Sequence, residues 1–283
     1  MKKYLAALSV LLMIATPVVS QASPEEDLKN FRAYFKDRFK DVPVEDYING
    51  VYAIDQASRE QWEQYEEFPP YEIYISKGEE IFNKKFANGK SFASCFPNYK
   101  KGIKQNYPYF DEASGQVVTM EGDINKCLTD NGEEAFKWQK GKIAYVGAYI
   151  AYLSRGKTIN VKTPSTPAAL AAYNKGKQHF YAKRGQLNMS CADCHYNNPG
   201  NKIRADILSP ALGHPSGFPV YRNSWASSDA GDGMGTLHRR YGGCNKQVRA
   251  KPFKPQSDEY KALEYFHTYM SNGLKLNGPS LRK

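Results

Sequence analysis

The stretch from Met189 to Tyr196 reads Met-Ser-Cys-Ala-Asp-Cys-His-Tyr and contains the pattern CxxCH. In this pattern the two thiols add to the vinyl groups of a haem, and the adjacent imidazole takes one axial position on the iron. Cys191, Cys194 and His195 are therefore expected to hold one covalently bound haem c. The pattern leaves the sixth position on the iron open, so the distal ligand has to be sought elsewhere in the chain.

Residues 1–22 are typical of a secretory signal peptide. Lys2 and Lys3 precede an apolar run over 4–19, and small residues stand at the expected cleavage point before Ser23. Because the run is shorter than the roughly 20 residues that span a bilayer, we expect cleavage and not a membrane anchor. No later segment is apolar enough to span. We therefore expect a periplasmic protein in an oxidising compartment, where haem c is attached and disulfides persist.

Charge is divided unequally along the chain. Residues 171–283 contain 17 Lys and Arg against 7 Asp and Glu, a balance of +10, whereas residues 23–170 contain 20 against 22, a balance of −2. A basic surface contributes to solubility, and around a redox site it also attracts small anions and acidic partners. Nucleic acid is not expected as a partner, since the chain has no basic helix or aromatic stacking platform.

Two sets of landmarks recur in the two halves. They are Lys77-Gly78, Ser94-Cys95, Thr119, Cys127 and Ser154 in the first half, and Lys175-Gly176, Ser190-Cys191, Thr236, Cys244 and Ser271 in the second. In both halves the threonine lies 8 residues before the cysteine, and the serine lies 27 residues after it. The repeat predicts two tandem cytochrome c-like units, of which only the second keeps its haem.

The expected fold is mainly α, because cytochrome c units are small helical bundles around the haem. Apolar helical patterns over 144–153 and 260–270 close the two repeats, and each is followed by glycine. A Pro-rich stretch over 164–167 marks a linker. The expected organisation is a signal peptide at 1–22, an N-terminal helical extension at 23–70, a haemless unit at 71–163 and a haem unit at 168–283.

The repeat also assigns four of the five cysteines. Cys95 is the counterpart of Cys191, in a unit whose motif has decayed and cannot attach haem. Cys127 is then left beside Cys95, and an oxidising compartment would join the two in a disulfide. Closing a loop of this length contributes about 3 to 4 kcal/mol in the chain-entropy model. Cys244 is left unpaired.

Four interpretations compete for Cys244: an inert buried thiol, a thiol that pairs with a partner protein, the distal haem ligand, or a redox nucleophile at the haem. Four cations lie within five residues of it, namely Arg239, Arg240, Lys246 and Arg249. Cations lower the pKa of a thiol and favour the thiolate, which binds metal and attacks sulfur. Gly242 and Gly243 allow the backbone to approach a bulky group.

Other side chains compete for the distal position. Met234, in a glycine-rich loop, is the best alternative, and His214 or His238 would give iron with two histidine ligands. His179 and His267 lie in expected helices and are read as structural or exposed. A thiolate lowers the potential of the iron and Met raises it. With Met or His as ligand, the chain would be an electron-transfer cytochrome c without catalysis, and Cys244 would be structural.

Two runs of the second half are distinctive. They are Phe218-Pro-Val-Tyr-Arg-Asn-Ser-Trp225 and Gly235-Thr-Leu-His-Arg-Arg-Tyr-Gly-Gly-Cys-Asn-Lys-Gln-Val-Arg-Ala-Lys-Pro-Phe253. With CxxCH upstream, they resemble the SoxA family, the larger cytochrome subunit of the SoxAX complex of bacterial thiosulfate oxidation. The similarity runs from about residue 70 to the end, and Ile124-Asn-Lys-Cys127 resembles the branch of the family with one haem.

The resemblance implies roles for individual residues. Cys244 falls on the family's active-site cysteine, a haem ligand that is found as a persulfide, and His195 would be the proximal ligand. Arg240 falls on an arginine that lines the substrate channel. SoxA sequences often carry a basic residue where this chain has Met270-Ser271, and Arg249 or Lys246 is the candidate to replace that half of the anion clamp.

The resemblance also implies an activity, that of an L-cysteine S-thiosulfotransferase. Thiosulfate would be joined oxidatively to Cys244 or its persulfide and passed to a cysteine of the carrier SoxYZ. Electrons would leave through the haem towards SoxX, in a heterodimer, and then a soluble cytochrome c. A thiosulfate dehydrogenase that forms tetrathionate is a further possibility, but that family carries two CxxCH motifs and this chain has one.

Overall fold

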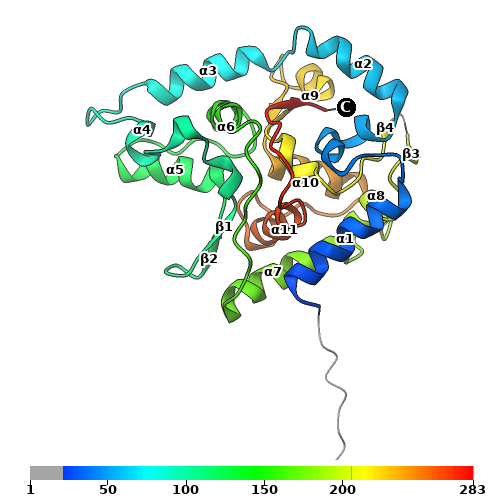
Figure 1. The fold of residues 1–283 in the computed structure, drawn as a ribbon. Helices are drawn as coiled ribbons and strands as arrows, with labels where there is room; N and C mark the ends of the chain where they lie inside the picture. Colours follow the sequence, from blue (N-terminus) through cyan, green and yellow to red (C-terminus); the bar gives the residue numbers. More distant parts are fainter. Residues whose placement is uncertain (1–21, 205, 283) are drawn as a thin grey trace, which may run out of the picture.

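The computed structural model describes residues 22–204 and 206–282, which fold mainly into helices (Figure 1). The α-helices are α1 (Pro24–Arg38), α2 (Gln56–Glu66), α3 (Glu72–Asn83), α4 (Phe92–Cys95), α5 (Met120–Asp130), α6 (Lys142–Leu153), α7 (Pro167–Tyr181), α8 (Cys191–His195), α9 (Asn223–Ser228), α10 (Leu237–Gln247) and α11 (Asp258–Tyr269). The 3-10 helices are η1 (Val44–Ala53), η2 (Tyr99–Lys101), η3 (Lys104–Asn106) and η4 (His214–Gly217). Among these residues, no helix combines the length and the apolar character needed to cross a membrane. Of the predicted signal peptide, residues 1–21 lie outside the described part.

The strands are short. They are β1 (Tyr109–Asp111), β2 (Gln116–Val118), β3 (Lys202–Ile203), β4 (Asp206–Ile207), β5 (Val220–Tyr221), β6 (Met234–Gly235) and β7 (Ser280–Leu281). Strands β1 and β2 form one antiparallel hairpin, and β3 and β4 form another. The third sheet has the order β6-β5-β7, in which β5 pairs antiparallel with β6 and parallel with β7. This sheet fixes the C-terminal end of the chain beside residues some 60 positions earlier.

Helices α3 and α6 cross closely in the first half. A Cβ added at Gly78 would stand 2.0 Å from the carbonyl oxygen of Tyr145, so only glycine allows this approach of the two backbones. Helix α6 was expected over 144–153 and spans Lys142–Leu153. Its apolar residues Ile143, Val146 and Ile150, three and four positions apart, are fully buried in one core cluster.

Helices α7 and α11 repeat this arrangement in the second half. A Cβ at Gly176 would stand 2.0 Å from the carbonyl oxygen of Ala262. The serine after each closing helix is also buried in an equivalent way: Ser154 Oγ accepts hydrogen bonds from the Ile103 and Lys104 amides, and Ser271 Oγ accepts one from the Gly213 amide. These paired contacts agree with the duplication that the sequence predicts. The residue limits of the two units remain a prediction.

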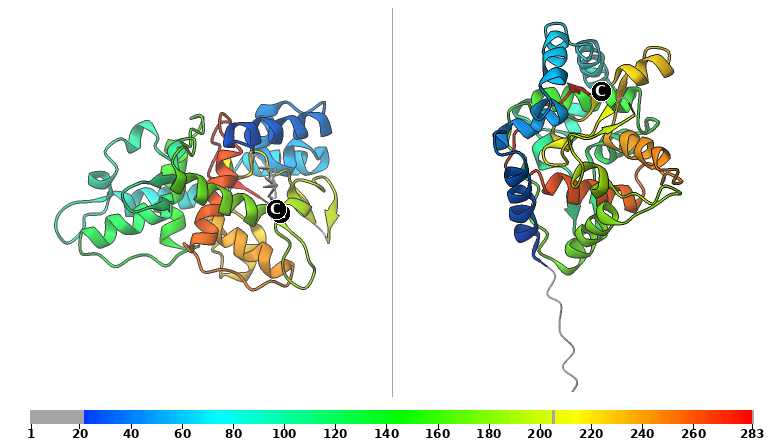
Figure 2. Two further views of the ribbon diagram at one scale, coloured as in Figure 1. Left: turned by 90° about the horizontal axis from the view of Figure 1, so that it is seen from below. Right: turned by 90° about the vertical axis from the view of Figure 1, so that its right-hand side faces the viewer.

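The N-terminal extension consists of α1, η1 and α2, and it packs on the second unit (Figure 2). Phe31 and Phe35 of α1 belong to the same core cluster as Phe180 of α7. The ring of Tyr34 stacks on that of Tyr196, directly after the CxxCH motif, with 3.8 Å between the ring centroids. The extension is therefore structurally part of the haem unit, although the first unit separates the two in sequence.

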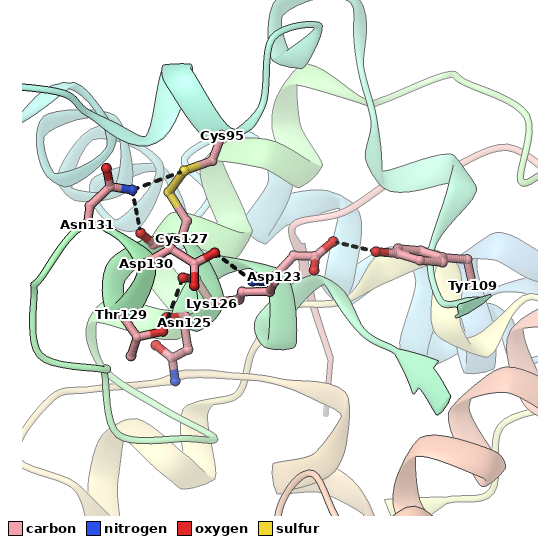
Figure 3. A network of polar contacts seen from close by, with 9 residues as sticks. All are labelled: Cys95, Tyr109, Asp123, Asn125, Lys126, Cys127, Thr129, Asp130 and Asn131. Carbon is pink, nitrogen blue, oxygen red and sulfur yellow. Dashed lines mark hydrogen bonds and ion pairs between the residues drawn. A yellow bond between two sulfur atoms is a disulfide. The ribbon is translucent and has the colours of Figure 1, made fainter. Parts of the chain in front are cut away.

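Cys95 and Cys127 form a disulfide that ties α4 to α5, as predicted (Figure 3). Cys127 is buried, and the Asn131 side chain donates a hydrogen bond to its carbonyl oxygen over 2.8 Å. Cys127 belongs to the core cluster of the first unit with Phe92, Phe96 and Ile124, whereas Cys95 is exposed. Cys191, Cys194 and Cys244 are free.

Candidate haem and cysteine site

One large cavity is lined by all three free cysteines and by His195. Cys191, Cys194 and His195 lie on the short helix α8. This helix begins with a capping box, in which Ser190 Oγ accepts the Asp193 amide and the Asp193 carboxylate accepts the Ser190 amide. The box satisfies two amides that a short helix would otherwise leave unpaired, and so it stabilises the turn that carries the motif.

The imidazole of His195 is oriented by its backbone neighbour. His195 Nδ1 lies 2.8 Å from the carbonyl oxygen of Ser209, and a carbonyl accepts hydrogen bonds only, so Nδ1 carries the proton. The lone pair is then on Nε2, which is the atom available to an iron ion. His195 is therefore held in the tautomer that a proximal haem ligand requires.

Cys244 lies on α10 and faces the same cavity. Burial by itself raises the pKa of the Cys244 thiol, but the charge of Arg240, the imidazole of His195 and the charge of Arg222 together outweigh it, and the pKa falls to about 7. The thiolate is the form that binds metal and attacks sulfur. The physical condition for a reactive cysteine is thus met at this position.

Of the four cations near Cys244 in sequence, only Arg240 lines the cavity. The Arg239 guanidinium is turned to the Asp229 carboxylate and the Met234 carbonyl oxygen. Lys246 and Arg249, the candidates for the second half of the anion clamp, are not among the residues that line the cavity. Of the four cations chosen for their nearness to Cys244 in sequence, one lines the cavity, because successive side chains of a helix point to different sides.

Three further arginines, which sequence reasoning did not select, also line the cavity: Arg184, Arg222 and Arg282. Arg184 bonds to His179 at the end of α7. Arg222 and Arg282 are 6% and 7% exposed, and the Nε atom of each has no hydrogen-bond partner among the described residues. Arg222 lies in the run that carries the family resemblance, which was the one signal that could have identified it.

The rival distal ligands are placed less favourably. Met234 is fully buried in a separate cluster with Tyr71, Tyr74 and Ala144, and it does not line the cavity. His238 is also outside the lining: its Nδ1 accepts the Gln256 amide, and its Nε2 lies 3.0 Å from the Glu264 carboxylate. Neither residue lines the cavity, so the structure does not favour either as the distal ligand.

Two other histidines do line the cavity. His267 is occupied at both nitrogens, since Nδ1 lies 3.1 Å from the Tyr241 hydroxyl and Nε2 lies 3.2 Å from the Ala211 carbonyl oxygen. The ring of His214 is centred 5.2 Å from that of His195. Burial holds the pKa of both histidines well below the ordinary value, so they are neutral. His179 is buried beside Arg184 and is structural, as expected.

The cavity fits a haem c in three independent respects. The two cysteines and the histidine of CxxCH face it together, as covalent attachment requires. Its walls are largely apolar, with Val51, Phe180, Phe218 and Leu263 among the lining residues. It also contains the buried, unpaired guanidinium atoms of Arg222 and Arg282, which call for an anionic ligand.

The helical fold and this cavity define a c-type cytochrome. A family model described as the SoxA/TsdA cytochrome c domain matches residues 77–159. The L-cysteine S-thiosulfotransferase subunit SoxA of Chlorobaculum tepidum is 55% identical over 93% of this chain and 89% of its own. The subunit of that name from Allochromatium vinosum is 50% identical over 99% of this chain and 98% of its own. The chain belongs to the SoxA family.

Among solved structures, the crystal structure of SoxXA from P. pantotrophus is similar, with a TM-score of 0.68 and 35% identity over 76% of this chain and 79% of that one. The fold inferred from the CxxCH motif and the repeat is thereby confirmed as that of a cytochrome c family. The match of the family model to 77–159 falls on the half that has no CxxCH. This agrees with a first unit that kept the fold after its attachment motif was lost.

Proposed function

We propose that this chain is the haem-bearing subunit of an L-cysteine S-thiosulfotransferase, with Cys244 as the sulfur nucleophile and Arg240 as the residue that binds thiosulfate. The observation that carries the proposal is the arrangement of one cavity: His195, Cys244 and Arg240 all line it together with the CxxCH cysteines. An electron carrier needs His195 and the CxxCH cysteines, but it does not need a free cysteine beside an arginine.

The overall reaction joins a carrier-protein cysteine to thiosulfate. The carrier S–H bond breaks, and a bond forms between that sulfur and the outer sulfur of thiosulfate. One proton and two electrons are released. The product is a cysteine that carries an S-thiosulfonate group with one negative charge, so atoms and charge balance.

The chain's own residues divide this reaction into two steps. Arg240 holds the thiosulfate dianion by charge-assisted hydrogen bonds and keeps Cys244 ionised. Oxidation then joins the Cys244 sulfur, as thiolate or persulfide, to the outer sulfur with loss of two electrons. In the second step the carrier thiolate attacks that outer sulfur, and Cys244 leaves in the form in which it reacted, as a thiolate or a persulfide anion.

The haem, when bound, supplies an acceptor that takes electrons one at a time. Cys191 and Cys194 would hold it covalently, and His195 and Cys244 would ligate its iron. The partners proposed are a SoxX-type cytochrome in a heterodimer, the SoxYZ carrier and a downstream cytochrome c. The similarity to a SoxXA crystal structure supports the first of these. The compartment proposed is the periplasm.

A test combines spectroscopy with one variant. Electron paramagnetic resonance and near-infrared magnetic circular dichroism of the ferric protein should give a low-spin thiolate signature, and an intact mass should show the mature chain plus one haem. Cys244→Ser should keep the haem and lose thiosulfate-dependent turnover. A His/Met signature would reject the proposal and leave an electron-transfer cytochrome. Thiosulfate-dependent turnover by Cys244→Ser would reject Cys244 as the nucleophile.

A further inference from the structure

Two arginines are brought side by side by strand pairing at the cavity wall. Strands β5 and β7 are parallel, with Tyr221 in register with Leu281. Arg222 and Arg282 directly follow these two strands, and the Arg282 amide donates a hydrogen bond to the Tyr221 carbonyl oxygen over 2.9 Å. Both side chains are buried and line the cavity. A buried cation is costly unless it is paired with an opposite charge. The pair needs a compensating charge.

The protein supplies little of that compensation to Arg222. Its guanidinium lies 3.8 Å from the Asp206 carboxylate, which is longer than a hydrogen bond, and 5.5 Å from the Trp225 ring. Burial, and then the charge of Arg240, lower the pKa of Arg222 to about 10. A buried cation without a full set of partners costs several kcal/mol. The positive charge of Arg222 therefore remains available to bind an anionic ligand.

Arg282 is prepared in a similar way. Its terminal nitrogens donate to the carbonyl oxygens of Ile48, over 2.6 Å, and Leu281, over 3.1 Å, which leaves Nε unpaired among the described residues. Gly50 and Gly217 make room for the group, since a Cβ at either would stand 3.4 Å and 2.7 Å from guanidinium atoms. The Arg282 guanidinium is thus fixed by two backbone carbonyl oxygens and also lines the cavity.

We propose that Arg222 and Arg282 form the binding site for the two propionate carboxylates of the haem. We assign these arginines to a carboxylate of the cofactor, and not to a substrate anion, because the cofactor stays bound permanently. Thiosulfate is absent between turnovers, and two buried cations would then stand uncompensated, whereas the propionates remain as long as the haem is attached. Two arginines also match two carboxylates in number, and guanidinium groups suit carboxylates in geometry. Arg240 is left for the substrate.

The proposal rests on haem attachment to α8 but not on the sulfur chemistry. Arg222→Gln is the informative change, because no protein hydrogen bond of its guanidinium is lost among the described residues. Arg222→Lys keeps the charge without the planar fork. Arg59→Gln, at a surface pair with Glu63, is the control for loss of one positive charge.

The readout is the midpoint potential of the attached haem as a function of pH. All potentials are measured with Cys244→Ser in every protein, because the Cys244 thiol, with a pKa of about 7, would otherwise titrate in the same range. With Arg222 present, paired propionates stay ionised, and we expect the potential to change little between about pH 5 and 8. In Arg222→Gln the unpaired propionate is a buried carboxylate with a raised pKa, so the potential should fall as pH rises and the group loses its proton. Of the titratable groups that face Arg222, Arg240, Asp206 and Tyr52 are retained in every variant, and only Cys244 is replaced. Arg222→Lys should lie between the two, and Arg59→Gln should follow the wild type.

A second arm separates the two sources of a bound anion. The substrate readout is the KM for thiosulfate in turnover with the carrier and an electron acceptor, and not kcat, because the charge of Arg222 also lowers the pKa of Cys244. In Arg222→Gln this KM should stay within about twofold of the wild type, because a twofold change is a small fraction of one hydrogen bond to a charged group. An unchanged potential with a KM raised tenfold or more would overturn the proposal and make these arginines substrate ligands. A change in neither would make them structural, which also overturns it. If the wild type shows no turnover, the proposed function fails while the potentials still decide this site.

Discussion

Gly78 and Gly176 occupy equivalent positions in two separate helix crossings. A Cβ added at either glycine would lie 2.0 Å from a carbonyl oxygen of the opposite helix. The opposing residues, Tyr145 and Ala262, are 117 positions apart, as are Cys127 and Cys244. One register therefore relates both the crossing and the cysteine in the two halves. In the duplication, Cys127, which forms a disulfide in the first unit, corresponds in position to Cys244, the reactive thiol of the second.

The crossing itself can be tested by Gly176→Ala. A methyl group at this position overlaps the Ala262 carbonyl, and overpacking of this kind costs about 1 to 3 kcal/mol or more. Chemical unfolding should show that loss, and Gly78→Ala should show a similar one. Gln178→Ala, at an exposed position of the same helix, is the control and should be close to neutral. A stable Gly176→Ala protein would mean that the helices do not approach this closely.

The disulfide should support the first unit without affecting the haem. Replacing both Cys95 and Cys127 by alanine removes the closure of a loop with a sequence separation of 32, which is worth about 3 to 4 kcal/mol. The haem spectrum should be unchanged, because neither cysteine lines the cavity. Urea unfolding of the double variant, followed by both far-ultraviolet circular dichroism and haem absorbance, measures the two effects. A shift in the haem spectrum would contradict the prediction that the disulfide does not affect the haem.

Arg240 should govern substrate binding and not the propionates. Arg240→Gln removes charge-assisted hydrogen bonds to thiosulfate worth about 1.5 to 3 kcal/mol, so kcat/KM should fall about 10- to 100-fold. When Cys244→Ser is present in both proteins, so that the thiol does not titrate, Arg240→Gln should leave the pH dependence of the haem potential unchanged. The pairing of Arg240→Gln with Arg222→Gln thus gives opposite patterns in the two assays. Equal kcat/KM values for Arg240→Gln and the wild type would remove Arg240 from the substrate site.

A buried carboxylate pair should make stability depend on pH. Glu121 of α5 and Glu264 of α11 are 8% and 7% exposed. Burial, and then the charge of Glu264, raise the pKa of Glu121 above its ordinary value. A raised folded-state pKa means that the folded chain holds a proton that the unfolded chain releases first. The stabilisation is complete below the ordinary pKa of Glu, near 4.3, and is lost as pH rises towards the folded-state pKa.

Glu121→Gln removes this dependence, because an amide does not titrate. The variant should lose less stability than the wild type when thermal unfolding is followed from pH 4 upward. Glu134→Gln, at an exposed position, is the matched control. Parallel curves for the wild type and Glu121→Gln would assign the titration to another group.

Several features followed from the sequence alone because they depend on covalent chemistry or on local spacing. CxxCH specifies haem attachment within five residues. The disulfide followed from the repeat and from an odd cysteine, and the closing helices followed from apolar residues at helical spacing. Cys244 was identified because its neighbours in sequence are cations and glycines.

The tertiary structure decided which side chains meet in the cavity. Lys246 and Arg249 are near Cys244 in sequence but do not line it, whereas Arg222 and Arg282 are 60 positions apart and enter it together through a parallel strand pair. Met234, plausible in a glycine-rich loop, is buried against the first unit, and the N-terminal extension packs on the second. These relationships depend on long-range packing between segments whose local patterns carry no record of their partners.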